Sequence, residues 1–332
     1  MEFKKHLKIF NIIGTINLST IDKEFVRTMV KKGVTMLRLN GAFLKQETLK
    51  AEIARVREWV GDDVSFLLDL PGYKLRLTHL KDEVQAQANI PFDLPSDYFN
   101  YPEFMDIVSE GTGVRVNDGL DKFTVIKRNS GTLSCLSDKD MKLKRGKGVH
   151  LDSISFRPEM HSLSKQDRDL IEIAKTGGID FLGLSFVYHV QDIKYVEGLI
   201  GNATMKCLPK IEAKESLKNL HEIMSYCKLV LVDRGDLSAE VGIENIWEVS
   251  RMIISCSRLL GAHTIFATQF LAHMVDKPIP SISEIDSMYD LMRAGIGGIQ
   301  LSEETGIGQF PFEAIDYITR IAQKASSYKT NI

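Results

Sequence analysis

Short runs of apolar residues alternate with longer segments of helical period along most of the chain. Residues 35–40 (TMLRLN) and 65–70 (SFLLDL), for example, flank a segment whose apolar positions recur at helical spacing. Eight such runs predict strands, at residues 8–14, 35–40, 65–70, 181–186, 205–212, 228–233, 263–268 and 298–302. Continuous apolar strands that alternate with helices are typical of a parallel sheet covered on both faces. Eight strand–helix units therefore predict an α/β fold, the (β/α)8 TIM barrel.

Capping residues support the helical segments. Residues 21–32 have helical spacing and end at Gly33, a residue suited to the turn after a helix. Ser164 is a favoured N-cap residue, and Asp167 follows three positions later, which predicts a helix through Lys175. These signals place helices between strands, as a barrel requires.

The alternation breaks between about residues 74 and 155. Turn signals occur at residues 117–119 (NDG) and 129–131 (NSG), and short β-like runs flank them, which is typical of hairpins. We therefore predict a small β-rich domain inserted after the third strand. The predicted division is residues 1–76 for the first part of the barrel, 77–155 for the inserted lid and 156–332 for the second part of the barrel.

Composition narrows the function classes. The 332 residues are 44% hydrophobic and 26% charged, which is ordinary for a globular protein and excludes a disordered, collagen-like or coiled-coil chain. The net charge of -2 gives no general attraction to nucleic acid or to anionic membranes, so neither is expected as a partner. No apolar window approaches the length of a membrane span, and the N-terminal residues lack the order of a signal peptide. We expect a cytoplasmic protein.

Polar residues cluster where the predicted strands end, which is the end that carries the active site in this fold. They are Arg38, Asn40, Asp69, Lys210, Glu212, Arg234, Gly235, Asp236, Thr268, Gln269 and residues 302–304. Glu212 and Asp236, from adjacent strands, would hold a hard divalent ion together with water and substrate oxygens. Residues 234–237 would begin a short helix whose free N–H groups face an anion.

Each of these residues also has a plainer interpretation. A single Lys or Arg at a strand end is usually a solvated charge, and Glu212 or Asp236 alone would serve as a helix cap or a surface charge. Their joint occurrence at five strand ends favours a site. With Arg38, Arg76 and Lys210 supplying positive charge, we expect a Mg²⁺-assisted site for a small, highly anionic substrate. The eight histidines are scattered and receive no role.

Nine segments carry a resemblance to a known family. They are residues 36–40 (MLRLN), 67–76 (LLDLPGYKLR), 116–120 (VNDGL), 147–151 (KGVHL), 184–187 (LSFV), 209–212 (PKIE), 234–237 (RGDL), 267–269 (ATQ) and 301–305 (LSEET). In this order they resemble the pyruvate kinase family, from near residue 8 to about residue 327. The match spans that family's barrel and lid. Its third, allosteric domain would follow where this chain ends, so we expect no sugar-phosphate regulation, and a monomer or a homodimer formed through the barrel.

The resemblance implies a role for each residue at the phosphoryl and oxyacid end. Arg38 would hold the transferring phosphoryl group, and Lys210 would stabilise charge on that group and on the enolate. Thr268 would position proton transfer near the methyl carbon. The backbone N–H groups of Gly235 and Asp236 would bind the substrate carboxylate, a design that relies on positioning and charge neutralisation.

Metal and nucleotide roles follow from the same resemblance. Glu212 and Asp236 would be ligands of Mg²⁺ or Mn²⁺. Asn40 lies on the nucleotide side, Arg76 would reach the nucleotide phosphates from the edge of the lid, and Lys147 would approach the nucleotide from the lid itself.

Several positions depart from the family pattern, mostly on the nucleotide side. They are Ala42 for a serine that binds a monovalent cation, Phe43 for a histidine near the nucleotide, Thr15 for a proline, Asp233 for a small residue beside the metal, and Glu303 for a glycine. The metal and oxyacid side is retained, so the phosphoryl acceptor is less defined than the oxyacid.

A second set of departures concerns K⁺. Ala42 and Leu70 replace two of the family's monovalent-cation ligands, and Lys74 replaces a glutamate, as in the branch of the family that works without K⁺. A tethered ammonium near Asp69 and the phosphate would supply the charge that a bound K⁺ supplies elsewhere. We therefore expect no K⁺ requirement, with Lys74 and Asp69 as the cation substitute.

The resulting expectation is a pyruvate kinase-like phosphotransferase of glycolysis that converts phosphoenolpyruvate and ADP to pyruvate and ATP. One alternative is a Mg²⁺-dependent lyase, aldolase or decarboxylase acting on a pyruvate-related oxyacid, because enolate stabilisation is common to both reactions. The altered nucleotide side favours it, and the retained Lys147 opposes it. Another alternative is a non-catalytic effector-binding homologue, which the joint presence of Lys210, Glu212, Asp236 and Thr268 opposes.

Overall fold

Eight parallel strands close into a barrel, in the spatial order β1-β15-β14-β13-β12-β11-β3-β2. The structure, a computed structural model, describes residues 10–44, 46–80, 82–119, 121–152, 154, 156 and 163–327. The barrel strands are β1 (Asn11–Thr15), β2 (Met36–Asn40), β3 (Ser65–Leu70), β11 (Phe181–Leu184), β12 (Lys206–Ile211), β13 (Leu229–Asp233), β14 (His263–Ala267) and β15 (Gly298–Leu301). The predicted (β/α)8 TIM barrel with a β-rich insertion after the third strand is confirmed.

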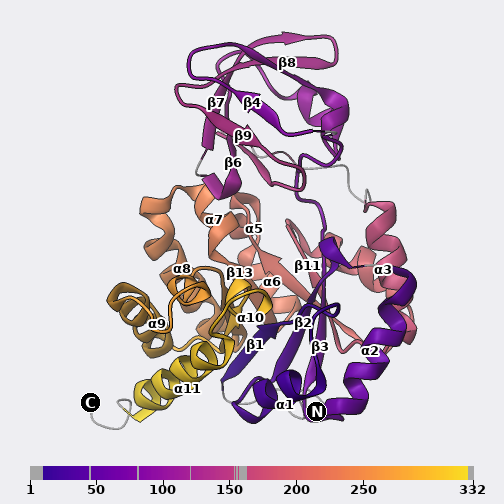
Figure 1. The fold of residues 1–332 in the computed structure, drawn as a ribbon, viewed down its shortest axis with the longest axis vertical. Coiled ribbons are helices and arrows are strands. Elements are labelled where there is room, and N and C mark those ends of the chain that lie inside the picture. Colours follow the sequence, from indigo (N-terminus) through magenta and orange to yellow (C-terminus); the bar gives the residue numbers. More distant parts are fainter. Residues whose placement is uncertain are drawn as a thin grey trace.

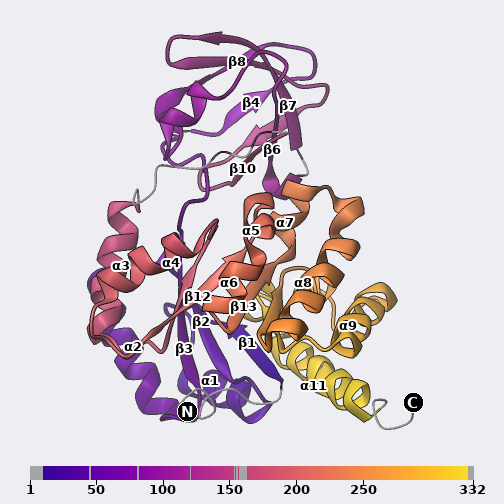
Figure 2. The same cartoon turned by 180° about the vertical axis from the view of Figure 1, so that it is seen from behind.

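Helices surround the barrel (Figures 1 and 2). They are α1 (Lys23–Lys31), α2 (Gln46–Val60), α3 (Lys165–Thr176), α4 (Val190–Ile200), α5 (Lys214–Lys218), α6 (Leu220–Tyr226), α7 (Arg234–Val241), α8 (Ile246–Leu260), α9 (Ile282–Ala294), α10 (Glu303–Gly306) and α11 (Pro311–Ser327). The capping box predicted at Ser164 is present, because its side chain accepts from the Asp167 backbone and the Asp167 side chain accepts in return. Gly33 takes a φ of 114° just after α1, as a helix-ending glycine does. Among the described residues, no helix combines the length and apolar character needed to cross a membrane.

The barrel closes where its first and last strands pair, with Asn11 beside Gly298. Its interior is packed with apolar side chains such as Ile13, Leu67 and Leu231, all fully buried. Residues 8 and 9 of the predicted first strand lie outside the described residues. Because the barrel interior is filled, a ligand has to bind at one end of it.

The insertion forms two antiparallel sheets, one in the order β10-β6-β7-β8-β5 and one of β4 and β9. These strands are β4 (Val84–Ala86), β5 (Phe92–Pro95), β6 (Gly113–Val116), β7 (Asp121–Asn129), β8 (Thr132–Leu136), β9 (Met141–Leu143) and β10 (Val149–Leu151). We call the region from β4 to β10 the lid. The predicted turn at residues 129–131 is a tight hairpin in which Asn129 pairs with Thr132 and Gly131 has a φ of 74°.

The lid stands over the end of the barrel at which α7 begins (Figure 1). It has its own apolar core, which includes the fully buried Leu94, Phe104 and Val125. Residue 155, the predicted end of the lid, lies outside the described residues, so the predicted domain boundaries stay a prediction. The arrangement leaves the carboxyl ends of the barrel strands facing the lid.

Candidate active site

A cleft of about 520 Å³ lies between the carboxyl ends of the barrel strands and the lid. On the barrel side its lining includes Arg38, Asn40, Asp69, Ser185, Lys210, Asp233 and Asp236. We call Arg38, Asp69, Lys210, Glu212, Asp233 and Asp236 the floor of the cleft. The opposite lining is Arg76, Thr78, His79, Asn100, Arg145 and Gly146, which we call the mouth. The cleft therefore occupies the position at which this fold places its active sites.

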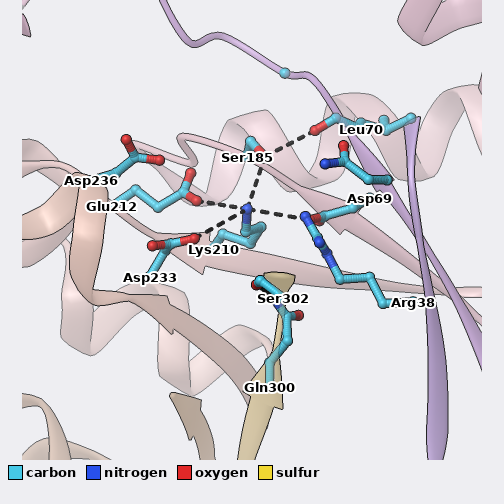
Figure 3. A network of polar contacts seen from close by, with 12 residues as sticks. Arg38, Asp69, Leu70, Ser185, Lys210, Glu212, Asp233, Asp236, Gln300 and Ser302 are labelled. Atoms are coloured by element: carbon cyan, nitrogen blue, oxygen red, sulfur yellow. Dashed lines mark hydrogen bonds and ion pairs between the residues drawn. The ribbon is translucent and has the colours of Figure 1, made fainter. Parts of the chain in front are cut away.

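Lys210 is the centre of the floor (Figure 3). Its side chain is almost fully buried, and its Nζ lies 2.7 Å from Glu212 Oε1 and 3.4 Å from Asp69 Oδ2. Nζ also donates to the Ser185 hydroxyl oxygen at 3.2 Å. Burial alone would lower the pKa of Lys210, but Asp69, Glu212 and Asp233 raise it. The ammonium therefore stays charged at the base of the cleft.

Arg38 is fixed in the same cleft by Asp69. Its Nε donates to Asp69 Oδ2 at 2.8 Å, and its Nη2 lies 2.7 Å from the same oxygen. Its Nη1 donates to the hydroxyl of Thr15, which in turn donates to the Leu301 carbonyl. Burial alone would raise the pKa of Asp69, yet Lys210 and Arg38 hold it below its usual value. Asp69 on β3 thus holds two cations at one place, one from β2 and one from β12.

Three carboxylates meet beside Lys210. Glu212, Asp233 and Asp236 each offer one oxygen, and these oxygens lie within 4.8 Å of one another. Glu212 is fully buried, and its Oε2 accepts from the Phe186 backbone at 2.7 Å. Burial raises the pKa of Glu212, an effect that Lys210 only partly offsets. Hard carboxylate oxygens gathered in this way suit Mg²⁺ or Mn²⁺ better than a soft metal.

Asp236 is contacted from the lid side by two basic side chains. Lys74 Nζ forms an ion pair with Asp236 Oδ1, and His150 Nε2 lies 3.4 Å from the same oxygen. His150 also places its Nδ1 3.2 Å from Glu240 Oε1, which joins lid strand β10 to α7. Burial would raise the pKa of Asp236, but Lys74 and His150 hold it well below its usual range.

Two of these contacts differ from what we expected from the sequence. Lys74 was expected beside Asp69, whereas its ammonium pairs with Asp236, because Asp69 already holds Lys210 and Arg38. His150 was given no role, yet it is buried between two carboxylates. Its position in the segment 147–151, within the family resemblance, was the one available signal.

The first turn of α7 packs against Thr268. The Asp233 side chain caps this helix, accepting at Oδ1 from Gly235 N at 3.1 Å and from the Thr268 hydroxyl. A Cβ atom at Gly235 would lie 2.8 Å from Thr268 Cγ2, so this position needs glycine. Thr268 and Gln269 have φ angles of 75° and 56°, a region that β-branched residues rarely adopt and that is frequent at functional sites.

Comparison with known proteins identifies the family. A family profile described as pyruvate kinase, barrel domain, matches residues 7–315. The chain belongs to the pyruvate kinase family. Pyruvate kinases are phosphotransferases, so this is an enzyme family.

Individual pyruvate kinases match at modest identity. The pyruvate kinase of Borreliella burgdorferi is 27% identical over 97% of this chain and 69% of its own length. That of Thermococcus litoralis is 28% identical over 100% of this chain and 72% of its own length. Pyruvate kinase 2 of Synechocystis is 28% identical over 96% of this chain, which spans 57% of that relative. The chain thus spans little more than half to nearly three quarters of these relatives.

Of the three residues predicted on the nucleotide side, two line the cleft and one does not. Arg76 lines the cleft, and its Nη1 donates to the Gly146 carbonyl at 3.0 Å. Lys147 is exposed and is not among the described residues that line the cleft, whereas Arg145 is. Asn40 lines the cleft and accepts from the Ala42 backbone at 3.2 Å. Arg145 was not among the predicted residues, because a basic residue in an exposed turn is usually a solvated surface charge.

Of the other departures, Ala42 lines the cleft and Glu303 begins α10. The Phe43 side chain lies outside the described part of the structure. Thr15, in place of the pyruvate kinase proline, supplies the hydroxyl that accepts from Arg38. The nucleotide-binding roles predicted for Asn40, Arg76 and Lys147 stay predictions.

Proposed function

We propose that this chain catalyses phosphoryl transfer from phosphoenolpyruvate to ADP, forming pyruvate and ATP. The observation that carries the proposal is the buried ammonium of Lys210 at the base of the cleft, held by Glu212, Asp69 and Ser185. A cation held in this way does not have to reorganise when negative charge develops on the phosphoryl group or the enolate. Family membership supports the same reaction.

Different residues of the floor stabilise different charges of the substrate. Arg38, oriented by Asp69, binds the transferring phosphoryl group, and Lys210 faces the bridging oxygen as the P–O bond breaks. Glu212 and Asp236 would hold Mg²⁺ or Mn²⁺, whose chemistry when bound is Lewis-acid stabilisation of the substrate oxygens. The floor needs such a cation, because its four carboxylates already outnumber the cations Arg38, Lys74 and Lys210 before an anionic substrate enters.

The remaining steps use α7 and the mouth. The backbone N–H groups of Gly235 and Asp236 bind the substrate carboxylate, and Thr268 positions the proton that adds to the methylene carbon of the enolate to form the methyl group of pyruvate. Arg76 binds the nucleotide phosphates at the mouth, with Asn40 and Lys147 nearby on the nucleotide side. Each of these roles is an extension from the pyruvate kinase family to matching residues of this chain.

We further propose that turnover needs no K⁺. Lys74 is 7% exposed, and its ammonium is committed to Asp236 in the site. It therefore supplies one fixed positive charge among the floor carboxylates. Asp69 forms its ion pairs with Arg38 and Lys210 instead. A fixed ammonium in this position removes the electrostatic need for a mobile monovalent cation.

The proposal is tested with the purified chain, phosphoenolpyruvate, ADP and Mg²⁺. We expect pyruvate and ATP in equal amounts, no product in excess chelator, and recovery when Mg²⁺ or Mn²⁺ is restored. Glu212→Gln should lower turnover about 100-fold or more, because it weakens the divalent-ion site. The exposed Glu172→Gln is the matched control and should leave turnover unchanged. Full activity in chelator, or of Glu212→Gln, would contradict the metal assignment.

The exposed position of Lys147 favours one second candidate, a lyase or decarboxylase that needs the enolate-stabilising floor but no nucleotide. Oxaloacetate is the test substrate, because its decarboxylation to pyruvate and CO₂ passes through the same enolate. Pyruvate formed from oxaloacetate without nucleotide, and none from phosphoenolpyruvate with ADP, would identify this activity. Pyruvate in neither assay would favour a non-catalytic homologue.

A further inference from the structure

The carboxylate of Asp233 accepts hydrogen bonds from the same donors that a bound carboxylate would use. Its Oδ1 accepts from Gly235 N at 3.1 Å and from the Thr268 hydroxyl, while its Oδ2 lies 4.0 Å from Lys210 Nζ. A helix N-terminal amide, a hydroxyl and an ammonium together form a preorganised anion site. Here the anion at that site is a side chain of the protein itself, and it belongs to the lining of the cleft.

Simultaneous use of these donors by Asp233 and by a ligand is sterically and electrostatically unfavourable. The Gly235 amide carries one hydrogen, and that hydrogen is already donated to Asp233. The Gly235 position is also confined, because even a Cβ atom there would lie 2.8 Å from Thr268 Cγ2 and 3.4 Å from Asp233 Oδ1. A ligand carboxylate that reaches the amide has to displace the Asp233 side chain, since two carboxylates repel each other at contact.

We propose that Asp233 is a specificity-determining residue that competes with the substrate carboxylate for the N-terminus of α7. The inference rests on the proposed function for the nature of the ligand, a small enol- or α-oxo-carboxylate. Binding of such a ligand includes the displacement of Asp233, so its affinity is lower than the floor would otherwise give. A substrate with a neutral group at this position does not meet that competition.

Two other roles for Asp233 make different predictions. As a simple N-cap, it stabilises α7 and leaves ligand affinity alone. As a third ligand beside Glu212 and Asp236, it strengthens divalent-ion binding, and its loss weakens every ligand that binds through the metal. The geometry favours competition, because beyond the cap bond this carboxylate also accepts from the Thr268 hydroxyl, lies 4.0 Å from Lys210 Nζ and lines the cleft.

The experiment measures oxalate binding, because oxalate is a small planar dicarboxylate with the oxygen arrangement of an enolate beside a carboxylate. Isothermal titration with oxalate is carried out at saturating Mn²⁺, and Mn²⁺ affinity is measured separately by electron paramagnetic resonance. Asp233→Gly frees the amide and is tolerated at an N-cap. Asp233→Asn keeps the capping oxygen and the size of the side chain but removes the charge.

We expect Asp233→Gly to bind oxalate about tenfold or more tightly than the natural chain, the size of one recovered charge-assisted hydrogen bond. Asp233→Asn should gain less oxalate affinity, because its side-chain oxygen still accepts from the Gly235 amide. Mn²⁺ affinity should change less than threefold in either variant. Unchanged or weaker oxalate binding in Asp233→Gly overturns the proposal. An equal gain in affinity in both variants also overturns it, because the gain would then come from removing the negative charge and not from freeing the amide. A tenfold loss of Mn²⁺ affinity would identify a metal ligand instead.

The test remains decisive if one variant does not fold. Thermal unfolding followed by circular dichroism checks each variant first, and Asp233→Asn, with its cap preserved, must still bind oxalate more tightly than the natural chain. Binding is also independent of turnover. A chain that forms no ATP contradicts the proposed function, whereas oxalate titration still decides whether Asp233 competes for α7.

Discussion

At the floor of the cleft, charged side chains hold one another, whereas at the mouth they are held by the backbone. Lys210 contacts Glu212 at 2.7 Å and Asp69 at 3.4 Å within a buried network. Arg76, by contrast, donates to the Gly146 carbonyl, and Lys147 is exposed. Buried ion pairs are weakly screened, and their geometry is fixed by several partners, whereas exposed cations are screened and mobile.

This difference shows which region of the cleft is arranged for catalysis in the absence of a ligand. The floor is organised before any ligand arrives, which is the condition for electrostatic stabilisation of a transition state. At the mouth, Arg76 is held by a backbone carbonyl and not by a carboxylate, so its charge stays available to the phosphates of an acceptor. Substitutions at the two regions should therefore differ both in size and in the kinetic constant that they change.

The largest effect is expected at the centre of the floor. Lys210→Ala should lower kcat by about 10²–10³, because it removes a preorganised charge from the transition state. It also removes the ammonium partner of the buried Glu212 and leaves Asp69 with Arg38 alone, so a loss of stability of about 3–5 kcal/mol is expected. Steady-state kinetics and denaturant unfolding measure the two effects separately. Near-normal turnover would remove Lys210 from the mechanism.

A smaller effect is expected where the floor meets the lid. The natural chain should turn over equally fast when K⁺ is exchanged for tetramethylammonium at constant ionic strength. Lys74→Met should lower the rate about tenfold, because Asp236 loses a fixed ammonium, which is equivalent to about 1.4 kcal/mol of transition-state stabilisation. K⁺ should restore part of the loss.

Lys74→Glu, which recreates the glutamate of K⁺-dependent relatives, should have lower activity still and a greater K⁺ response. The exposed Lys144→Met, in the turn after β9, is the matched control. A rate drop beyond about tenfold in the natural chain on K⁺ removal would show that Lys74 does not replace the cation.

The smallest effects are expected at the mouth and at Lys147, the residue that follows Gly146 of the mouth. Arg76→Ala should raise KM for ADP about threefold to tenfold with little change in kcat, because a solvent-screened phosphate contact contributes roughly 1 kcal/mol. Lys147→Ala should change KM for ADP less than threefold, since its side chain does not line the cleft in the described residues. Initial rates at varied ADP give both constants. A larger effect at Lys147 than at Arg76 would show that the lid closes further over the nucleotide.

The barrel could be predicted from the sequence because its evidence is local. Apolar runs at strand length, the box at Ser164 and the turn at residues 129–131 each depend on a few neighbouring residues. The end of the barrel that carries the cleft then follows from the fold itself. Asp69, Lys210 and Glu212 were identified as candidates because each lies at the carboxyl end of a barrel strand.

The partners of those candidates could not be predicted in the same way. Lys74 and Asp236 lie 162 residues apart, and spacing does not tell which of several carboxylates an ammonium will reach. The contact of His150 with Glu240 depends on how the lid docks against α7, which is a tertiary property. Asp233 was recognised only as added negative charge, because its hydrogen bond to Gly235 depends on the side-chain conformation at the helix start.

The pairing of β1 with β15 has a consequence for the order in which the chain acquires structure. Asn11 has its partner at Gly298, so the first strand of the barrel waits for the eighth. Until then β1 and β3 each present an unpaired edge, while the lid strands, all within residues 84–151, find every sheet partner inside that segment. Contacts between distant residues form late and slowly. We therefore expect the barrel to expose unpaired strand edges for longer than the lid while the chain folds, and exposed edges favour aggregation.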